Sequence, residues 1–209
     1  MPTVVRMQYA LPNAQFLNDL LTDDLILRYV KDDYETGEQC IEFYDTRDWT
    51  LSAAGFSLGI TRSQEIPVSI LNQGKRRAES MQGLYTGVEW VAPFTDLAHC
   101  VSLLRGRGAP EAFEAAVGAQ ALTRCFYTIS RTKSTTLYLP DRTRIDMSFD
   151  NGELVAGDKR QPVYALYLEL LYGDEAPLFH YCRQLSEHFQ LSPVLLSRHQ
   201  QALRLLRSR

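Results

Sequence analysis

The chain has 209 residues, of which 45% are apolar and 22% are charged. This composition is that of an ordinary globular domain, and it excludes a mainly disordered or low-complexity chain. The net charge of −3 argues against the broad basic excess that nucleic-acid-binding proteins usually carry. We therefore expect a single domain over residues 1–209 and no nucleic-acid partner.

The sequence also indicates where the protein works. It contains no run of about 18 apolar residues, so we expect no membrane-spanning helix. The N-terminus lacks a basic region followed by an apolar run, so we expect no signal peptide. Four cysteines are isolated from one another and show no CxxC spacing: Cys40, Cys100, Cys125 and Cys182. We interpret them as reduced thiols rather than disulfide pairs, and we expect a cytoplasmic protein.

The first half of the chain alternates between strand and helix patterns. A period of two predicts strands at residues 4–10, 39–44, 56–62, 68–72 and 84–91. A period of 3.6 predicts a short helix after Pro12, a helical turn that ends near Gly55, and helical structure between Pro93 and Val117. Most of these strands follow one another closely enough to be joined as hairpins.

The second half is predicted to be mostly strand and to end in helices. Residues 122–139 predict one long strand or a pair, and further strands are expected at 142–149 and 162–171, with a hairpin turn at Asp150-Asn151-Gly152. Helices are expected at 175–189 and at 193–206, the latter with Ser192 as its cap and Pro193 as its first residue. About eight antiparallel strands favour a closed barrel with helices packed outside, an α+β fold, because closure removes exposed strand edges.

Several segments carry a family resemblance. Tyr44-Asp45-Thr46-Arg47-Asp48, followed by Leu51 and by residues 54–58, resembles a motif of the CYTH family, also called triphosphate tunnel metalloenzymes. Three later segments resemble further motifs of that family, in the same order: Arg131 with residues 145–152, residues 162–173, and residues 196–205. The resemblance covers nearly the whole chain.

The resemblance implies an eight-stranded antiparallel tunnel. In the family, glutamates inside the tunnel hold Mg²⁺ or Mn²⁺, while lysines and arginines bind a triphosphate. Members include inorganic triphosphatases, thiamine-triphosphatases, RNA triphosphatases and a class of adenylyl cyclases. Such a site needs paired cations and a metal, because a buried polyanion is otherwise too costly to desolvate.

The resemblance fails at many tunnel-facing positions. In the first strand, Val4, Arg6 and Gln8 stand where the family has two glutamates and a lysine. Other positions that are charged in the family fall on residues 58–61, Asn72 and Gln201. One family strand carries three acids and a lysine; the corresponding residues here are Ala165, Tyr167, Glu169 and Leu171, so only one acid remains. The opposite faces keep their apolar residues, namely Val5, Met7, Tyr9, Phe56, Leu58, Ile60, Ile145, Met147, Phe149, Leu166, Leu168 and Leu170. We interpret this as a retained fold with an altered function.

The same alternation predicts which charged side chains remain inside. These are Arg131, Lys133, Arg144, Asp146, Asp150 and Glu169, with Arg198 at the tunnel mouth. One interpretation is a residual binding site, in which Arg131, Lys133, Arg144 and Arg198 hold an anion and Asp146, Asp150 and Glu169 hold a metal. The other is an internal salt-bridge network that fills an unused tunnel. Tyr167 and other tyrosines could instead line an apolar tunnel for an organic ligand.

We therefore expect a CYTH-like tunnel-barrel protein that has lost metal-dependent triphosphatase activity and acts as a ligand-binding or interaction module. We assign no catalytic residue and expect no cofactor, or Mg²⁺ or Mn²⁺ if activity remains. The expected ligand is a phosphorylated or organic small molecule in the tunnel. The alternative is a divergent metal-dependent phosphohydrolase that acts on inorganic or organic triphosphates.

Overall fold

The computed structural model describes residues 3–62, 66–76 and 82–208. Within these ranges the chain forms nine strands and seven helices. The strands are β1 (Thr3–Ala10), β2 (Glu35–Asp45), β3 (Phe56–Thr61), β4 (Val68–Arg76), β5 (Leu84–Pro93), β6 (Thr123–Tyr138), β7 (Arg144–Ala156), β8 (Lys159–Tyr172) and β9 (Ser192–Pro193). The helices are α1 (Ala14–Leu21), α2 (Asp24–Leu27), α3 (Thr50–Ala53), α4 (Leu97–Gly106), α5 (Glu111–Val117), α6 (Glu175–Phe189) and α7 (Arg198–Arg207).

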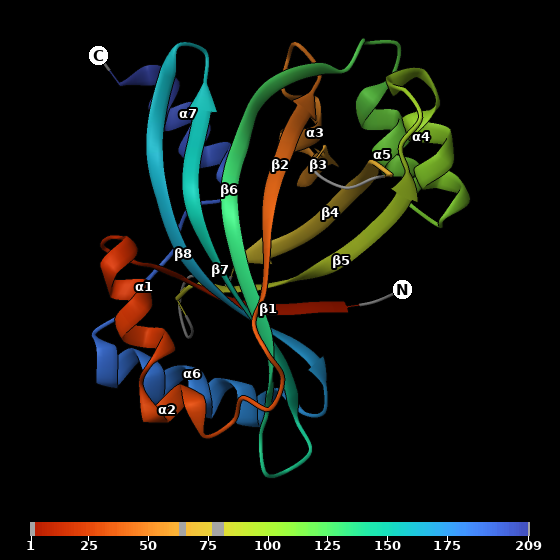
Figure 1. The fold of residues 1–209 in the computed structure, drawn as a ribbon. Coiled ribbons are helices and arrows are strands. Elements are labelled where there is room, and N and C mark those ends of the chain that lie inside the picture. The colour runs from red at the N-terminus through yellow and green to blue at the C-terminus, as the bar shows by residue number, and fades with distance from the viewer. Residues whose placement is uncertain (1–2, 63–65, 77–81, 209) are drawn as a thin grey trace.

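Eight of the strands close into an antiparallel barrel (Figure 1). Their hydrogen-bonded order is β5-β4-β3-β2-β6-β7-β8-β1, and β1 completes the ring by pairing with β5 as well as with β8. The two-residue strand β9 lies beside the end of β1. The arrangement confirms the predicted α+β fold with an eight-stranded antiparallel barrel, and residues 123–138 form one long strand rather than a pair.

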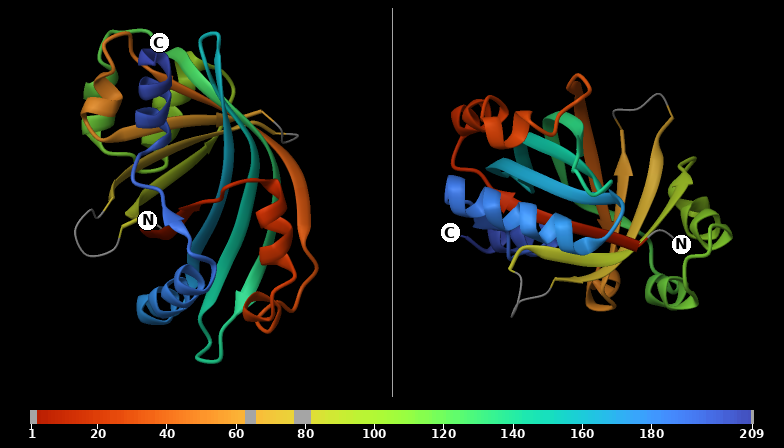
Figure 2. Two further views of the ribbon diagram at one scale, coloured as in Figure 1. Left: turned by 90° about the vertical axis from the view of Figure 1, so that its left-hand side faces the viewer. Right: turned by 90° about the horizontal axis from the view of Figure 1, so that it is seen from below.

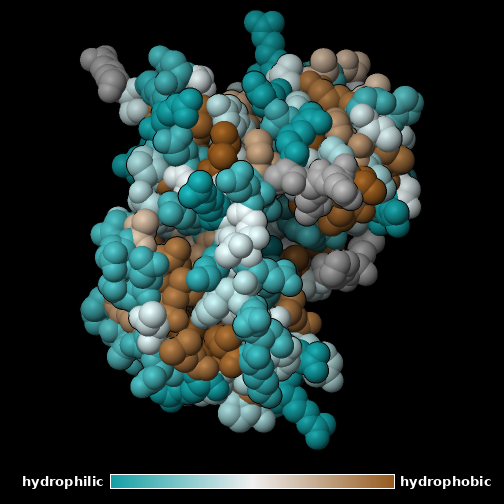
Figure 3. Space-filling model, viewed as in Figure 1, coloured by the Kyte–Doolittle hydropathy of each residue, from teal (hydrophilic) through white to brown (hydrophobic). Residues whose placement is uncertain are grey.

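Two groups of helices cover the outside of the barrel (Figure 1). Helices α1, α2 and α6 pack on β1, β7 and β8 through a buried cluster that includes Met7, Met147 and Leu168. Helices α3, α4 and α5 pack on β3, β4 and β5 through a second cluster that includes Leu58 and Ile60. Figure 3 shows hydrophilic atoms over the middle strands and apolar atoms gathered closer to the helices. The predicted outward apolar faces are therefore confirmed.

Helix α7 packs on the inside of the barrel. Ala202 belongs to a buried cluster with Phe126, Val163 and Ala165, and Leu205 packs against that cluster. Ala165 has the strand parity opposite to Leu166, which lies in the outer cluster, so its side chain points inward. The left-hand view of Figure 2 shows α7, in dark blue, beside β7 and β8. The C-terminal helix thus fills one mouth of the barrel.

The predicted hairpin turn at Asp150-Asn151-Gly152 is wrong. Strand β7 runs straight through these residues, and Gly152 pairs with Ser130 of β6 and with Val163 of β8. A side chain is excluded at Gly152, because an added Cβ would lie 2.0 Å from the carbonyl oxygen of Ile129. Tertiary pairing on both sides therefore overrides the local turn preference of Asn-Gly, and β7 ends only at Ala156.

The predicted start of the last helix is also wrong. Ser192 and Pro193 form β9, and α7 begins at Arg198. Its N-cap is Ser197, whose hydroxyl accepts the Gln200 N–H, while the Gln200 side chain accepts the Ser197 N–H. This capping box satisfies two helix-end donors, which the position at Ser192 could not do in an extended strand.

Two further sequence predictions can be compared with the structure. All four cysteines are free thiols, as predicted, and Cys100 and Cys182 are buried. In the described ranges, no helix is both long enough and apolar enough to span a membrane.

Candidate functional site in the barrel interior

The middle of the inner barrel wall carries a patch of polar side chains from three neighbouring strands, β1, β8 and β7. Arg6 of β1 lies opposite Glu169 of β8, and Glu169 lies opposite Asp146 of β7. In the adjacent register, Gln8 lies opposite Tyr167, which lies opposite Ser148. Their sequence neighbours belong to the outer apolar cluster, so these residues point into the barrel.

Arg6 and Glu169 form the central ion pair of this wall. Arg6 donates its Nε–H to the Glu169 carboxylate at 2.6 Å, and Nη2 pairs with the same oxygen. Burial acts to lower the pKa of Arg6, but the charge and hydrogen bond of Glu169 outweigh it and raise that pKa. The Arg6 guanidinium also lies 6.0 Å from the centre of the Tyr167 ring. This arginine is therefore fixed on its own wall.

Two further carboxylates share this region. Burial raises the pKa of Asp146, and the nearby charge of Glu169 raises it further. Burial likewise raises the pKa of Glu89 on β5, against the opposing effect of Arg6. Among the described residues, neither Glu89 nor Asp146 has a cationic side chain within ion-pair distance. Both carboxylates are thus poorly compensated, and both favour the neutral form more than a free carboxylate does.

A second polar group lies nearer the mouth that α7 fills. Arg198 of α7 donates to the Tyr167 hydroxyl at 2.5 Å and to the Gln201 side chain at 3.0 Å, and it lies 3.9 Å from Asp150. Burial raises the pKa of Asp150, although Arg198 and the hydroxyls of Tyr167 and Ser130 oppose the shift. The guanidinium of Arg198 therefore serves to hold α7 against the wall.

Two residues that were predicted to point into the barrel, Arg131 and Lys133, point outward instead. Arg131 pairs with Asn151, and its side chain is 82% exposed, with Glu38 at 3.6 Å. Lys133 lies opposite Phe149 of the outer cluster, and its ammonium sits 4.7 Å from the centre of the Tyr34 ring. The inward residues of β6 are instead the alternate, uncharged ones, because Ser130, Thr132 and Ser134 share the face of Asp150 and Ser148.

The remaining predicted residues divide between the rim and the interior. Arg144 has the parity of the inner wall, but it is exposed at the end of β7 and lies over the Tyr138 ring at 5.5 Å. Arg198, Asp146, Asp150 and Glu169 lie inside. Sequence reasoning missed Glu89, and it noted Arg6 only as a departure from the family. The sequence already placed Arg6 at a tunnel-facing position, and strand parity could have identified Glu89 as inward in the same way.

The three predicted metal ligands do not converge on one ion. Asp146 and Glu169 are directly opposed, but Asp150 lies four residues along β7, which places its Cα about 13 Å from that of Asp146. Glu169 is already paired with Arg6, and Asp150 lies beside Arg198. In the described part of the chain, no group of three or more histidine, cysteine, aspartate or glutamate side chains is arranged to hold a metal ion. These residues therefore do not fit the Mg²⁺ or Mn²⁺ that the resemblance implies.

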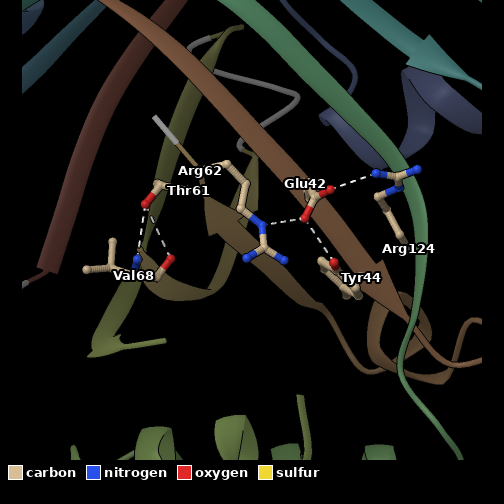
Figure 4. A network of polar contacts seen from close by, with 6 residues as sticks. All are labelled: Glu42, Tyr44, Thr61, Arg62, Val68 and Arg124. Carbon is tan, nitrogen blue, oxygen red and sulfur yellow. Dashed lines mark hydrogen bonds and ion pairs between the residues drawn. The ribbon is translucent and has the colours of Figure 1, made fainter. Parts of the chain in front are cut away.

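A separate polar cluster lies on the outer wall (Figure 4). The Glu42 carboxylate of β2 accepts hydrogen bonds from Arg62 and Arg124 at 2.7 Å each, and from the Tyr44 hydroxyl at 3.0 Å. Burial acts to raise the pKa of Glu42, but these three donors outweigh it and lower that pKa. Figure 4 shows the two guanidinium groups on opposite sides of the carboxylate. The cluster links the end of β3, β2 and β6, and we interpret it as a structural contact.

Comparison with known proteins gives structural neighbours only. No protein-family model matches the sequence, and no curated protein matches it. A Hippeastrum protein studied as a candidate adenylyl cyclase, and described as having a dominant triphosphatase activity, superposes with a TM-score of 0.60 at 12% identity, covering 96% of this chain and 95% of its own.

Two further solved structures give similar values. A candidate adenylate cyclase from Bacillus halodurans has a TM-score of 0.54 at 12% identity, covering 94% of this chain and 96% of its own. A Pyrococcus horikoshii OT3 protein has a TM-score of 0.52 at 11% identity, covering 96% and 98%. At these identities the likeness concerns the fold alone, so the chain shares with these proteins an eight-stranded antiparallel barrel with helices packed around it.

Proposed function

We propose that this protein is a tunnel-barrel module that binds a ligand or a partner and does not hydrolyse triphosphates. One observation carries the proposal: the two guanidinium groups that the described residues place on the inner wall are already held by the wall itself. Arg6 is bound to Glu169, and Arg198 is bound to Tyr167 beside Asp150. A triphosphate would have to displace these contacts before either arginine could bind it.

The charge of the inner wall supports the same conclusion. Away from the exposed rims, the described inner side chains include four carboxylates and two guanidinium groups, namely Glu89, Asp146, Asp150, Glu169, Arg6 and Arg198. A triphosphate carries about four negative charges, so this wall repels it unless metal ions reverse the balance. Among the described residues, no three carboxylates are arranged to hold one metal ion, which argues against such a reversal.

The proposal is tested by assaying phosphate release from tripolyphosphate, thiamine triphosphate and ATP with Mg²⁺ and with Mn²⁺. The Hippeastrum protein serves as the positive control, because a dominant triphosphatase activity is described for it. We expect no release above the metal-only blank. Turnover that disappears in Asp146→Asn would overturn the proposal, since it would show that an inner carboxylate supports catalysis.

A divergent metal-dependent phosphohydrolase remains the second candidate function. The observation that favours it is the pair Asp146 and Glu169, two carboxylates directly opposed on β7 and β8 inside the barrel. Titration of the protein with Mn²⁺, followed by calorimetry and electron paramagnetic resonance, separates the two candidates. A site of micromolar affinity that is lost in Asp146→Asn would support the hydrolase, whereas weak, unsaturated binding would support the module.

A further inference from the structure

The setting of His199 is unusual for a histidine. This residue lies in the first turn of α7 and is only 6% exposed in the barrel mouth. Its ring meets three aromatic rings edge-on, Phe126 at 4.8 Å, Phe43 at 5.8 Å and Trp49 at 6.2 Å between centroids. Nδ1 lies 3.4 Å from the Ser57 hydroxyl, and Nε2 is buried without a hydrogen-bond partner in the described structure. This cage suits a neutral imidazole and opposes an imidazolium, which needs an acceptor at each nitrogen.

The polar groups around His199 do not compensate a positive charge. From β2 the field of Asp45 favours protonation, but the Asp45 carboxylate already accepts the N–H groups of residues 46, 51 and 52. From β3 the ring meets only the Ser57 hydroxyl, and Cys125 of β6 is a neutral thiol whose pKa burial raises to about 11.

The other charged groups near this ring lie outside the cage. Arg47 and Asp48, in the loop that carries Trp49, are both exposed. On α7 itself, the neighbouring Arg198 is turned toward Tyr167. Burial is therefore the dominant influence, and it lowers the pKa of His199 from 6.5 to about 4.

Helix α7 is attached to the barrel in a way that permits it to leave. Besides His199, helix α7 contacts the barrel through the packing of Ala202 and Leu205, through the bonds of Arg198, and through the Lys159 ammonium of β8, which donates to the carbonyls of Leu206 and Ser208. Residues 194–197 join it to β9, and a groove of about 500 Å³ lies between this linker and β8, lined by Leu11, Pro12, Val163, Tyr164, Leu195 and Leu196 among others. Movement about the linker would break none of the strand pairs that close the barrel.

We propose that α7 is an acid-released plug: protonation of His199 drives α7 out of the barrel mouth about residues 194–197 and uncovers Tyr167 and Asp150 on the inner wall. The imidazolium gains water at both nitrogens when α7 leaves, whereas the closed ladder of eight strands stays intact. Acid would thus open the tunnel without unfolding the barrel.

The direction and size of the effect follow from linkage. A histidine whose pKa is lower in the docked state leaves docking unaffected above its free pKa, and it weakens docking as the pH falls toward the docked pKa. With a free value of 6.5 and a docked value of about 4, the undocked-to-docked ratio rises by roughly tenfold per pH unit and by roughly 300-fold in all.

The experiment uses the full chain between pH 7.5 and pH 4. Hydrogen exchange of peptides over residues 198–208, corrected for intrinsic rates, reports α7, and exchange of peptides over β6 to β8 reports the barrel. Trp49 fluorescence gives a second signal, because the Trp49 ring lies against His199. The variant Trp49→Phe shows how much of the fluorescence change comes from Trp49 and how much from Trp90. The matched control is His199→Phe, which keeps a ring in the aromatic cage but cannot be protonated.

The expected result is that α7 loses protection below pH 6.5 while β6 to β8 stay protected, and that His199→Phe abolishes the loss. Three results would each overturn the proposal. These are loss of protection in α7 and the strands together, retention of α7 protection down to pH 4, and acid release that persists in His199→Phe.

Discussion

Arg6 of β1 and Glu169 of β8 lie directly opposite each other on the inner wall, and the Arg6 Nε–H donates to the Glu169 carboxylate at 2.6 Å. The two residues are 163 positions apart in the chain. Their contact decides the chemistry of the interior, because it uses the arginine of β1 to neutralise the wall instead of a ligand.

This pair predicts a measurable coupling. Glu169→Gln or Arg6→Met leaves its partner uncompensated, so each is expected to lower the free energy of unfolding by about 1–2 kcal/mol, a value reduced for partial solvent screening. The double variant should lose less than the sum of the two single variants. Urea denaturation at pH 7 gives all three values, and strictly additive losses would show that the contact contributes nothing.

The close packing at Gly152 predicts that adding one methyl group there lowers the free energy of unfolding strongly. Its added Cβ would lie 2.0 Å from the Ile129 carbonyl oxygen of the paired strand. We expect Gly152→Ala to destabilise the protein by about 3 kcal/mol, at the upper end of overpacking costs. The control is Gly106→Ala, because nothing lies within 4 Å of its added Cβ, and we expect it to be neutral or slightly stabilising. Equal thermal midpoints for the two variants would contradict the strand placement of Gly152.

Glu42 predicts a pH-dependent contribution to stability. Its pKa is lowered, so its stabilisation is present above the ordinary value of 4.5 and is lost as the pH falls through the lower folded value. Glu42→Gln should therefore cost about 1–2 kcal/mol at pH 7 and much less near pH 2. Chemical denaturation at several pH values measures the difference between the two proteins.

The matched control for Glu42 is Glu38→Gln on the same strand. Glu38 is 79% exposed and lies 3.6 Å from Arg131, so its loss should cost less than about 0.5 kcal/mol at any pH. A difference between wild type and Glu42→Gln that stays constant with pH would show that the carboxylate charge is not the stabilising element.

The capping role of Ser197 can be tested against that of Ser192, the cap expected from the sequence. Ser197→Ala removes the capping box and should weaken α7 by about 1 kcal/mol. Ser192→Ala changes an exposed side chain of β9 and should leave α7 unchanged. Amide exchange of residues 199–207 distinguishes the two, and the reverse ranking would restore the start predicted from Pro193.

The outer faces of the barrel could be predicted from sequence because their pattern is strong. Met7, Met147 and Leu168 belong to runs in which every second residue is apolar, and a shift by one residue would expose the whole set. Strand β6 has no such pattern. Thr128 to Ser134 alternates small polar residues with Ile129, Arg131 and Lys133, so neither face is distinctly apolar, and its orientation was predicted wrongly.

The fold class and the outward apolar faces could be predicted from the sequence, because both depend on periodicity along single strands. The tertiary structure was needed to show that β7 continues through Asn151-Gly152, that Arg131 and Lys133 face outward, and that Glu89 lies among the inner carboxylates. It was also needed to show that Arg6 binds Glu169 and that α7 enters the barrel mouth. These features arise from pairing between distant segments, and the free energy of such pairing exceeds local preferences of a few tenths of a kcal/mol to about 1 kcal/mol.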